Sequence, residues 1–175
     1  GVASQLNATT SDINGDGIED LLVTTYVAST STEARLYLGV GDGTYGTATV
    51  LPTPTTGAYD IVAGDFTGDG WNDVIVTQST TSSGSNKIAM FTNNGSGTLG
   101  SASEIAITSG PTGGVRTCNI EKGNVDANSS LDLVIICQVS TNAFVFLNNG
   151  TGSFTQSTVA MGFSGGSPQR FALAD

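Results

Sequence analysis

The nine residues Asp12-Ile-Asn-Gly-Asp-Gly-Ile-Glu-Asp20 are the first of three copies of one pattern. The other copies are Asp65-Phe-Thr-Gly-Asp-Gly-Trp-Asn-Asp73 and Asn124-Val-Asp-Ala-Asn-Ser-Ser-Leu-Asp132, and each of the three runs directly into an apolar stretch. Their first residues lie 53 and 59 positions apart (65 − 12 and 124 − 65). Self-similarity at a period of this length indicates a repeat protein in which each copy belongs to one structural unit.

Each repeat contains residues suited to four short strands. One strand enters the acidic loop, one leaves it, one precedes a Gly-x-Gly turn and one follows that turn. The turns begin at Gly41, Gly95 and Gly150, and we expect the strands after them over residues 47–51, 103–107 and 158–161. Runs of Val, Ile, Phe and Tyr bounded by Gly and Asn favour strands, and no segment shows a sustained helical period. We therefore predict an all-β fold of β-propeller blades, each with four antiparallel strands.

The repeat frame divides the chain into about three blades. We expect these blades over residues 1–55, 56–112 and 113–168, within a single repeat domain that covers residues 1–175. Residues 169–175 lead up to the place where a fourth loop would start, so we expect them to form the first strand of a further blade. Since a closed ring needs roughly four to eight blades, the chain is predicted to be part of a larger propeller.

The first two acidic loops carry the oxygen donors of a calcium site. Positions 1, 3, 5, 7 and 9 are Asp12, Asn14, Asp16, Ile18 and Asp20 in the first loop, and Asp65, Thr67, Asp69, Trp71 and Asp73 in the second. Carboxylate, amide and hydroxyl oxygens, with the backbone carbonyl of position 7, are ligands that Ca²⁺ prefers. A helical EF-hand would need Glu at position 12, where this chain has Val23, Val76 and Ile135. The pattern therefore predicts Ca²⁺ bound in loops between strands.

The third loop is a weaker candidate for calcium. Its donors would be Asn124, Asp126, Asn128, the carbonyl of Ser130, and Asp132. It has two carboxylates where each of the other loops has three, and Ser129 replaces the glycine of the bend. A residue with a side chain resists the positive φ that glycine adopts readily. We expect two calcium sites and a poorer third.

These loops and turns resemble the FG-GAP/VCBS repeats of integrin-α-like β-propellers. In that family a loop of the form Asp-x-Asn-x-Asp-Gly-x-x-Asp joins the first two strands of a blade, and the turn at Asn149 to Phe154 matches the VCBS form. The resemblance covers nearly the whole chain and departs from the family in the third loop. It implies a calcium-stabilised, secreted or cell-surface propeller that serves adhesion or the recognition of a glycan or protein, without catalysis.

Composition excludes several other classes of protein. The chain has 15 acidic and 5 basic residues, a net charge of −10, which disfavours binding to nucleic acid. It has no His and therefore no Ser-His-Asp machinery, and its apolar runs are too short to insert into a membrane. Uncharged polar residues alternating with Val, Ile and Leu favour an extracellular protein. Two strands joined by the third loop would bring Cys118 and Cys137 roughly opposite each other, so they form either a disulfide, which we expect, or two buried thiols.

Three alternatives remain open from the sequence. Open strand edges suit a structural subunit that associates with itself into a ring, filament or surface layer. Carboxylates outside the loops could form the acid pair of a carbohydrate-active enzyme; the candidates are Glu33, Asp42, Asp60, Glu104 and Glu121. Phe66 and Trp71 either form a platform for a ligand or pack between blades.

Overall fold

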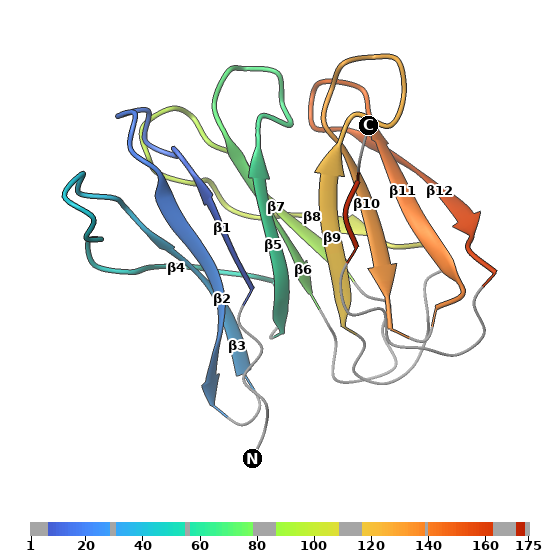
Figure 1. Ribbon diagram of the computed structural model, residues 1–175, viewed down its shortest axis with the longest axis horizontal. Coiled ribbons are helices and arrows are strands. Elements are labelled where there is room, and N and C mark those ends of the chain that lie inside the picture. The colour runs from blue at the N-terminus through green and yellow to red at the C-terminus, as the bar shows by residue number, and fades with distance from the viewer. Residues whose placement is uncertain are drawn as a thin grey trace.

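A computed structural model describes residues 7–28, 31–54, 57–78, 87–108, 117–138, 140–162 and 171–173 of the chain. These residues form three four-stranded antiparallel sheets and no helix, which confirms the predicted all-β architecture of propeller blades (Figure 1). Blade 1 contains β1 (Asn7–Ser11), β2 (Asp20–Ala28), β3 (Ser31–Tyr37) and β4 (Thr49–Leu51). Blade 2 contains β5 (Ala58–Gly64), β6 (Asp73–Gln78), β7 (Lys87–Phe91) and β8 (Ser103–Ala106). Blade 3 contains β9 (Cys118–Gly123), β10 (Asp132–Cys137), β11 (Asn142–Asn148) and β12 (Phe154–Ala160).

Each blade pairs its strands in chain order, so the first and fourth strands are the two edges of its sheet. The first strands β1, β5 and β9 lie side by side, and each blade extends outward from them to β4, β8 and β12 (Figure 1). The acidic loops join the first and second strands of each blade. In the part of the chain that the structure describes, no helix is long and apolar enough to span a membrane.

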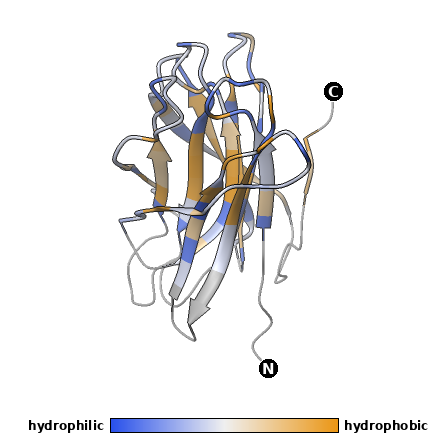
Figure 2. Ribbon diagram, turned by 90° about the vertical axis from the view of Figure 1, so that its left-hand side faces the viewer, coloured by the Kyte–Doolittle hydropathy of each residue, from blue (hydrophilic) through white to orange (hydrophobic). Residues whose placement is uncertain are grey.

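The core consists of two apolar layers, one on each side of blade 2. Side chains on one face of β6, such as Val74 and Val76, pack against blade 1, while Ile75 on the other face packs against blade 3. Side chains alternate between the two faces of a strand, so a strand between two blades is covered on both faces. All residues of β6 are accordingly buried, and Figure 2 shows the apolar residues concentrated within the sheets.

Buried threonines add polar bonds to the apolar contact between neighbouring blades. The hydroxyl of Thr24 on β2 donates to the carbonyl oxygen of Tyr59 in blade 2, at 2.8 Å. The hydroxyl of Thr77 on β6 donates to the carbonyl oxygen of Cys118 in blade 3, at 2.7 Å. The two joints are therefore built in the same way, because these threonines occupy the same position in the repeat, twelve residues after the first loop residue (24 − 12 and 77 − 65).

Two features at the end of the chain differ from the pattern of strands expected from the sequence. The last strand of blade 3 begins at Phe154, four residues before the expected start at residue 158. Its early start is stabilised by contact between the rings of Phe154 and Phe66, whose centroids lie 6.2 Å apart. Residues 171–173 are not in a strand, and Phe171 packs on the outer face of blade 3 against Val134 and Ile136. The other residues of the expected strand at 169–175 lie outside the described part of the structure.

Candidate functional site

The ninth residue of each acidic loop is a fully buried aspartate that anchors the loop. Asp20, Asp73 and Asp132 each have 0% of their surface exposed. One carboxylate oxygen accepts the N–H of the second loop residue: Ile13 at 2.8 Å, Phe66 at 3.1 Å and Val125 at 2.9 Å. The other oxygen accepts an N–H from the end of the third strand or just after it: Gly39 at 2.8 Å, Asn93 at 2.9 Å and Asn148 at 2.8 Å. All three loops therefore close in the same way.

Burial and hydrogen bonding have opposite effects on the pKa of one of these carboxyl groups, that of Asp73. Burial of its carboxyl group raises the pKa of Asp73 above the ordinary value, because desolvation disfavours the charged form. The N–H groups of Asn93 and Phe66 oppose this shift by donating to the carboxylate. The energetic cost of burying this charge is thus offset by backbone donors, which are positioned by the loop itself.

In the first two loops the backbone also wraps around the first residue. The carboxylate of Asp12 accepts the N–H groups of Gly15, at 2.7 Å, and Gly17, at 2.8 Å. The carboxylate of Asp65 accepts the equivalent N–H groups of Gly68, at 2.6 Å, and Gly70, at 2.9 Å. All four glycines have positive φ, between 74° and 89°, which residues with a side chain adopt reluctantly. The glycines therefore allow each loop to turn its N–H groups toward one carboxylate.

The remaining predicted ligands lie along the exposed arc of these loops. Oδ1 of Asn14 accepts the N–H of Asp16 at 3.1 Å, and Oδ1 of Asp16 accepts the N–H of Ile18 at 2.8 Å. In the second loop, Asp69 accepts the N–H of Trp71 at 2.9 Å. Thr67 at position 3 has a buried hydroxyl group that interacts with the carboxylate of Asp73 and opposes the rise in the pKa of Asp73.

The third loop lacks the wrapped first residue. Ser129 has φ of 63° and is the one non-glycine residue with positive φ among the described residues. Asp126, at position 3, accepts the N–H of Asn128 at 2.9 Å, and Oδ1 of Asn128 accepts the N–H of Ser130 at 2.8 Å. The Asn128 amide also donates to the carbonyl oxygen of Asn148 at 2.7 Å. Asn124 at position 1 is exposed. The loop is held by its own side chains rather than around a central carboxylate.

The donor chemistry of the first two loops fits Ca²⁺, whereas the arrangement of the carboxylates is not that of a preformed cluster. Within the described ranges, no three His, Cys, Asp or Glu side chains converge on a common point. The loop carboxylates accept backbone N–H groups instead, and each oxygen retains further lone-pair capacity. The third loop fits the ion less well, because it offers fewer carboxylates and no wrapped first residue.

The two aromatic residues of the second loop pack between blades. Phe66 is fully buried, so it offers no surface to a ligand. Trp71 is 37% exposed, and its indole fills the space beside Gly15 of blade 1 and Gly95 of its own blade. A methyl carbon added to these glycines would lie 2.5 Å and 2.2 Å from indole atoms. The structure thus assigns Trp71 a packing role at the first joint.

A disulfide joins Cys118 and Cys137 at the ends of β9 and β10 that are farthest from the third loop. The two residues are directly paired across β9 and β10, and both are buried. The disulfide therefore closes the strands that lead into and out of this loop.

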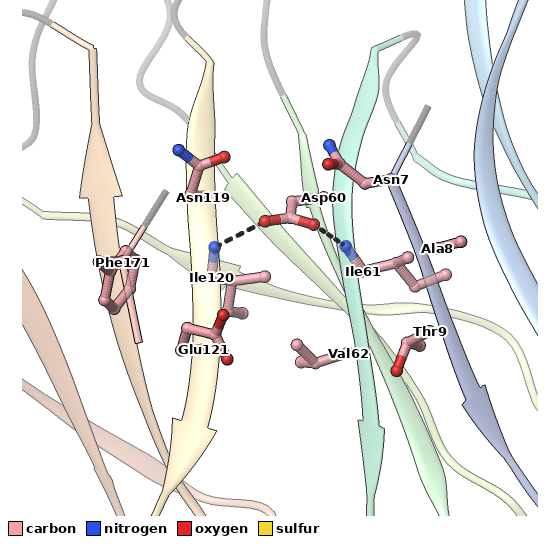
Figure 3. A pocket seen from close by; sticks show the side chains of 10 residues that line it. All are labelled: Asn7, Ala8, Thr9, Asp60, Ile61, Val62, Asn119, Ile120, Glu121 and Phe171. Atoms are coloured by element: carbon pink, nitrogen blue, oxygen red, sulfur yellow. Dashed lines mark hydrogen bonds between the residues drawn. The ribbon is translucent and has the colours of Figure 1, made fainter. Parts of the chain in front are cut away.

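The inner strands β1, β5 and β9 line a polar pocket (Figure 3). The cavity is about 120 Å³ in volume, and its lining includes Asn7 from β1, Asp60 from β5, and Asn119 and Glu121 from β9. Asp60 lies between β5 and β9, where its carboxylate accepts the N–H groups of Ile61 at 2.9 Å and Ile120 at 3.0 Å. Phe171 lines another side of the pocket.

The pocket was not predicted from the sequence, although the repeat frame contains a signal for it. Asn7, Asp60 and Asn119 each precede the first loop residue by five positions (12 − 5, 65 − 5 and 124 − 5). Of the carboxylates considered for an enzyme, Asp60 and Glu121 meet in this pocket. The other three make local contacts: Glu33 with Arg35 at 3.0 Å, Glu104 with Lys87 at 2.7 Å, and Asp42 with the N–H of Thr44 at 2.9 Å.

Four-stranded antiparallel sheets that pack face to face, with inner strands around a common pocket, define a protein of the β-propeller class. The sequence pattern of the FG-GAP-like repeat matches residues 12–76 and 65–121. The chain therefore belongs to the FG-GAP-like repeat family, as its loops predicted.

One solved structure similar to this chain is a lectin from Agrocybe aegerita, described for its specific recognition of non-reducing terminal N-acetylglucosamine. The two are 20% identical, with a TM-score of 0.59 over 91% of this chain and 39% of the lectin. This likeness concerns the fold alone, and the chain spans about two-fifths of the lectin's length. A search of curated proteins finds no significant match.

Proposed function

We propose that this chain is a non-catalytic recognition module of an extracellular β-propeller and that its ligand is a glycan. The observation that carries the proposal is the polar pocket between the inner strands. Each of the three blades contributes a polar side chain to it from the same position of the repeat, five residues before the loop. Amide and carboxylate groups that converge in a concave site are suited to hydrogen-bond sugar hydroxyl and acetamido groups. The structurally similar lectin recognises a terminal N-acetylglucosamine, which supports a glycan over a protein as the ligand.

The pocket chemistry favours binding over catalysis. Both oxygens of the Asp60 carboxylate accept backbone N–H groups, and such bonds stabilise the ionised form rather than a proton donor. A glycosidase needs one carboxylic acid that donates a proton and a second carboxylate that acts as nucleophile or base. Asp60 is therefore unsuited to the role of the acid, and the repeat family and the structurally similar lectin further support binding over catalysis.

A panel of glycans that includes terminal N-acetylglucosamine tests the proposed recognition. We expect saturable binding by the natural chain and at least a tenfold loss, about 1.4 kcal/mol, for Asn119→Ala. Ser103→Ala, on the outer strand of blade 2, is the matched control and should bind normally. Binding that is unchanged by Asn119→Ala would place the ligand elsewhere, and release of a free sugar would contradict the non-catalytic assignment.

We further propose that Ca²⁺ stabilises the propeller through the first two loops. The supporting observations are the three carboxylates in each of these loops and the glycines that shape the backbone. A disulfide between Cys118 and Cys137 suits an oxidising extracellular compartment, where calcium modules bind with dissociation constants on the order of 10⁻⁴ to 10⁻³ M. The third loop is proposed to bind more weakly.

Calorimetric titration with Ca²⁺ and thermal unfolding in its presence test this proposal. We expect two sites and a rise in melting temperature that chelation reverses. Asp65→Asn should abolish one site, whereas Asp126→Asn in the third loop should leave both. The absence of heat and of stabilisation at several millimolar Ca²⁺ would contradict calcium binding.

Residues 171–173 are proposed to begin a further blade. Phe171 occupies the repeat position of Ile61 and Ile120, four residues before a loop would start. Ile61 and Ile120 lie in the apolar layers between blades, and Phe171 lies in the layer on the outer face of blade 3. This shared placement supports continuation of the propeller beyond blade 3.

A further inference from the structure

The three outer strands differ in how they end the sheets. β4 has three residues and is followed by Pro52. β8 has four residues, and its Glu104 forms an ion pair with Lys87 at 2.7 Å. β12 has seven residues, with neither a charged residue nor a proline. Among the described residues, each outer strand has one hydrogen-bonded neighbour strand.

These differences matter because an outer strand presents unpaired N–H and C=O groups to any other strand. Proteins protect such edges by keeping them short, or with charges, prolines or bulges. β4 and β8 have such protection, whereas β12 has none of it. Its seven residues pair with β11 in one unbroken register, without a bulge.

β12 is also held in place by blade 2. Phe154 packs near Phe66, as described above. The side-chain amide of Gln156 makes two bonds with the backbone of Thr108: Oε1 accepts its N–H at 2.7 Å, and Nε2 donates to its carbonyl oxygen at 2.5 Å. An edge that is already ordered loses little conformational freedom when another strand is added.

We propose that β12 is a self-association site, at which it pairs antiparallel with β12 of a second copy of this chain. A two-fold axis through Ser157 would place Thr155 opposite Val159, and Phe154 opposite Ala160, since each pair is centred on residue 157. No charge opposes a like charge in this arrangement, although the whole chain carries −10. Val159 is 51% exposed, and its burial would add an apolar contact to the main-chain hydrogen bonds.

Cross-linking through a single introduced thiol tests the position of the two-fold axis. Ser157→Cys would be the only free thiol among the described residues, because Cys118 and Cys137 are joined. Oxidation should convert this variant from 17.6 kDa to twice that mass. Ser103→Cys, on the short edge β8, is the matched control and should remain a single chain. Equal cross-linking of both variants would overturn the proposal.

Sedimentation of the unmodified chain supplies the independent measurement. We expect a concentration-dependent dimer that Ser157→Lys abolishes, because two ammonium groups would meet at the axis, and that Ser103→Lys leaves intact. A single-chain mass at all concentrations would overturn the proposal, as would a dimer that Ser157→Lys leaves unchanged. Either result is independent of whether the chain binds a glycan or calcium.

Discussion

The acidic loops of blades 2 and 3 have the same length and the same buried anchor, yet they are organised differently. Asp73 and Asp132 both accept N–H groups from the second loop residue and from the end of the third strand or just after it. In blade 2 the backbone also wraps around Asp65 through Gly68 and Gly70, whereas Asn124 in blade 3 has no such shell. The comparison shows that the ninth residue sets the path of the loop. The glycines determine whether the backbone N–H groups of the loop converge on its first residue.

The loop of blade 3 has other means of support. The Asn128 side chain donates to the carbonyl oxygen of Asn148, and a disulfide joins β9 and β10 at their ends farthest from the loop. The side-chain amide of Asn148 donates to the carbonyl oxygen of Leu131 in the same loop at 3.1 Å and to that of Phe66 in the loop of blade 2 at 2.8 Å. The Asn148 side chain thus contributes to the stability of both loops.

Removal of the buried anchors should have the largest effect on stability. Asp73→Ala leaves three backbone donors without their acceptor, those of Phe66, Thr67 and Asn93. We expect it to lower the free energy of unfolding by about 3–5 kcal/mol, and Asp132→Ala, with two such donors, by about 2–4 kcal/mol. Chemical denaturation in the presence of a chelator measures both values. Asp69→Ala, on the exposed arc, is the control, and a cost as large as that of Asp73→Ala would refute the anchoring role.

Loss of the disulfide should come next and should affect blade 3 selectively. The bridge closes a chain segment with a sequence separation of 19 residues, for which loop entropy predicts a stabilisation of about 3 kcal/mol. Reduction of the natural chain should therefore lower its melting temperature and increase amide exchange on β9 and β10 more than on β5 and β6. The variant with both cysteines changed to alanine should show no response to reductant. Uniform destabilisation of blades 2 and 3 would argue that the two loops depend equally on this bridge.

Substitution of the bend residue at position 6 of each loop should have the smallest effect on the free energy of unfolding. The effect should be opposite in sign in the two loops. Gly70 has φ of 89° and open space where a side chain would lie, so Gly70→Ala should cost about 1–2 kcal/mol through backbone strain alone. Ser129→Gly relieves the same kind of strain at φ of 63° and should stabilise the chain by up to about 1 kcal/mol, less the added entropy of the unfolded glycine. Thermal unfolding of the two variants provides the comparison. If both substitutions stabilise the chain, or both destabilise it, the backbone strain at the two bends is not equivalent.

The repeat pattern predicted the fold class and the loop boundaries because both depend on local spacing. Alternating apolar residues and Gly-x-Gly turns specify strands and hairpins within a few residues of themselves. The bend at position 6 of the third loop also followed from local spacing, since Ser129 adopts the positive φ that glycine has at this position in the other two loops. The early start of β12 was not predicted, because it depends on the contact of Phe154 with Phe66, which lies 88 residues earlier (154 − 66).

The amino-acid order alone determined the number of repeats, the acidic loops and the family to which the chain belongs, because each depends on residues that are near neighbours along the backbone. Tertiary structure decided which side chains share a site. It brought Asn7, Asp60 and Asn119 into one pocket, placed Trp71 between two glycines, and buried the ninth loop residue under backbone donors. These outcomes depend on which faces of different blades meet, and the packing of distant strands determines that choice.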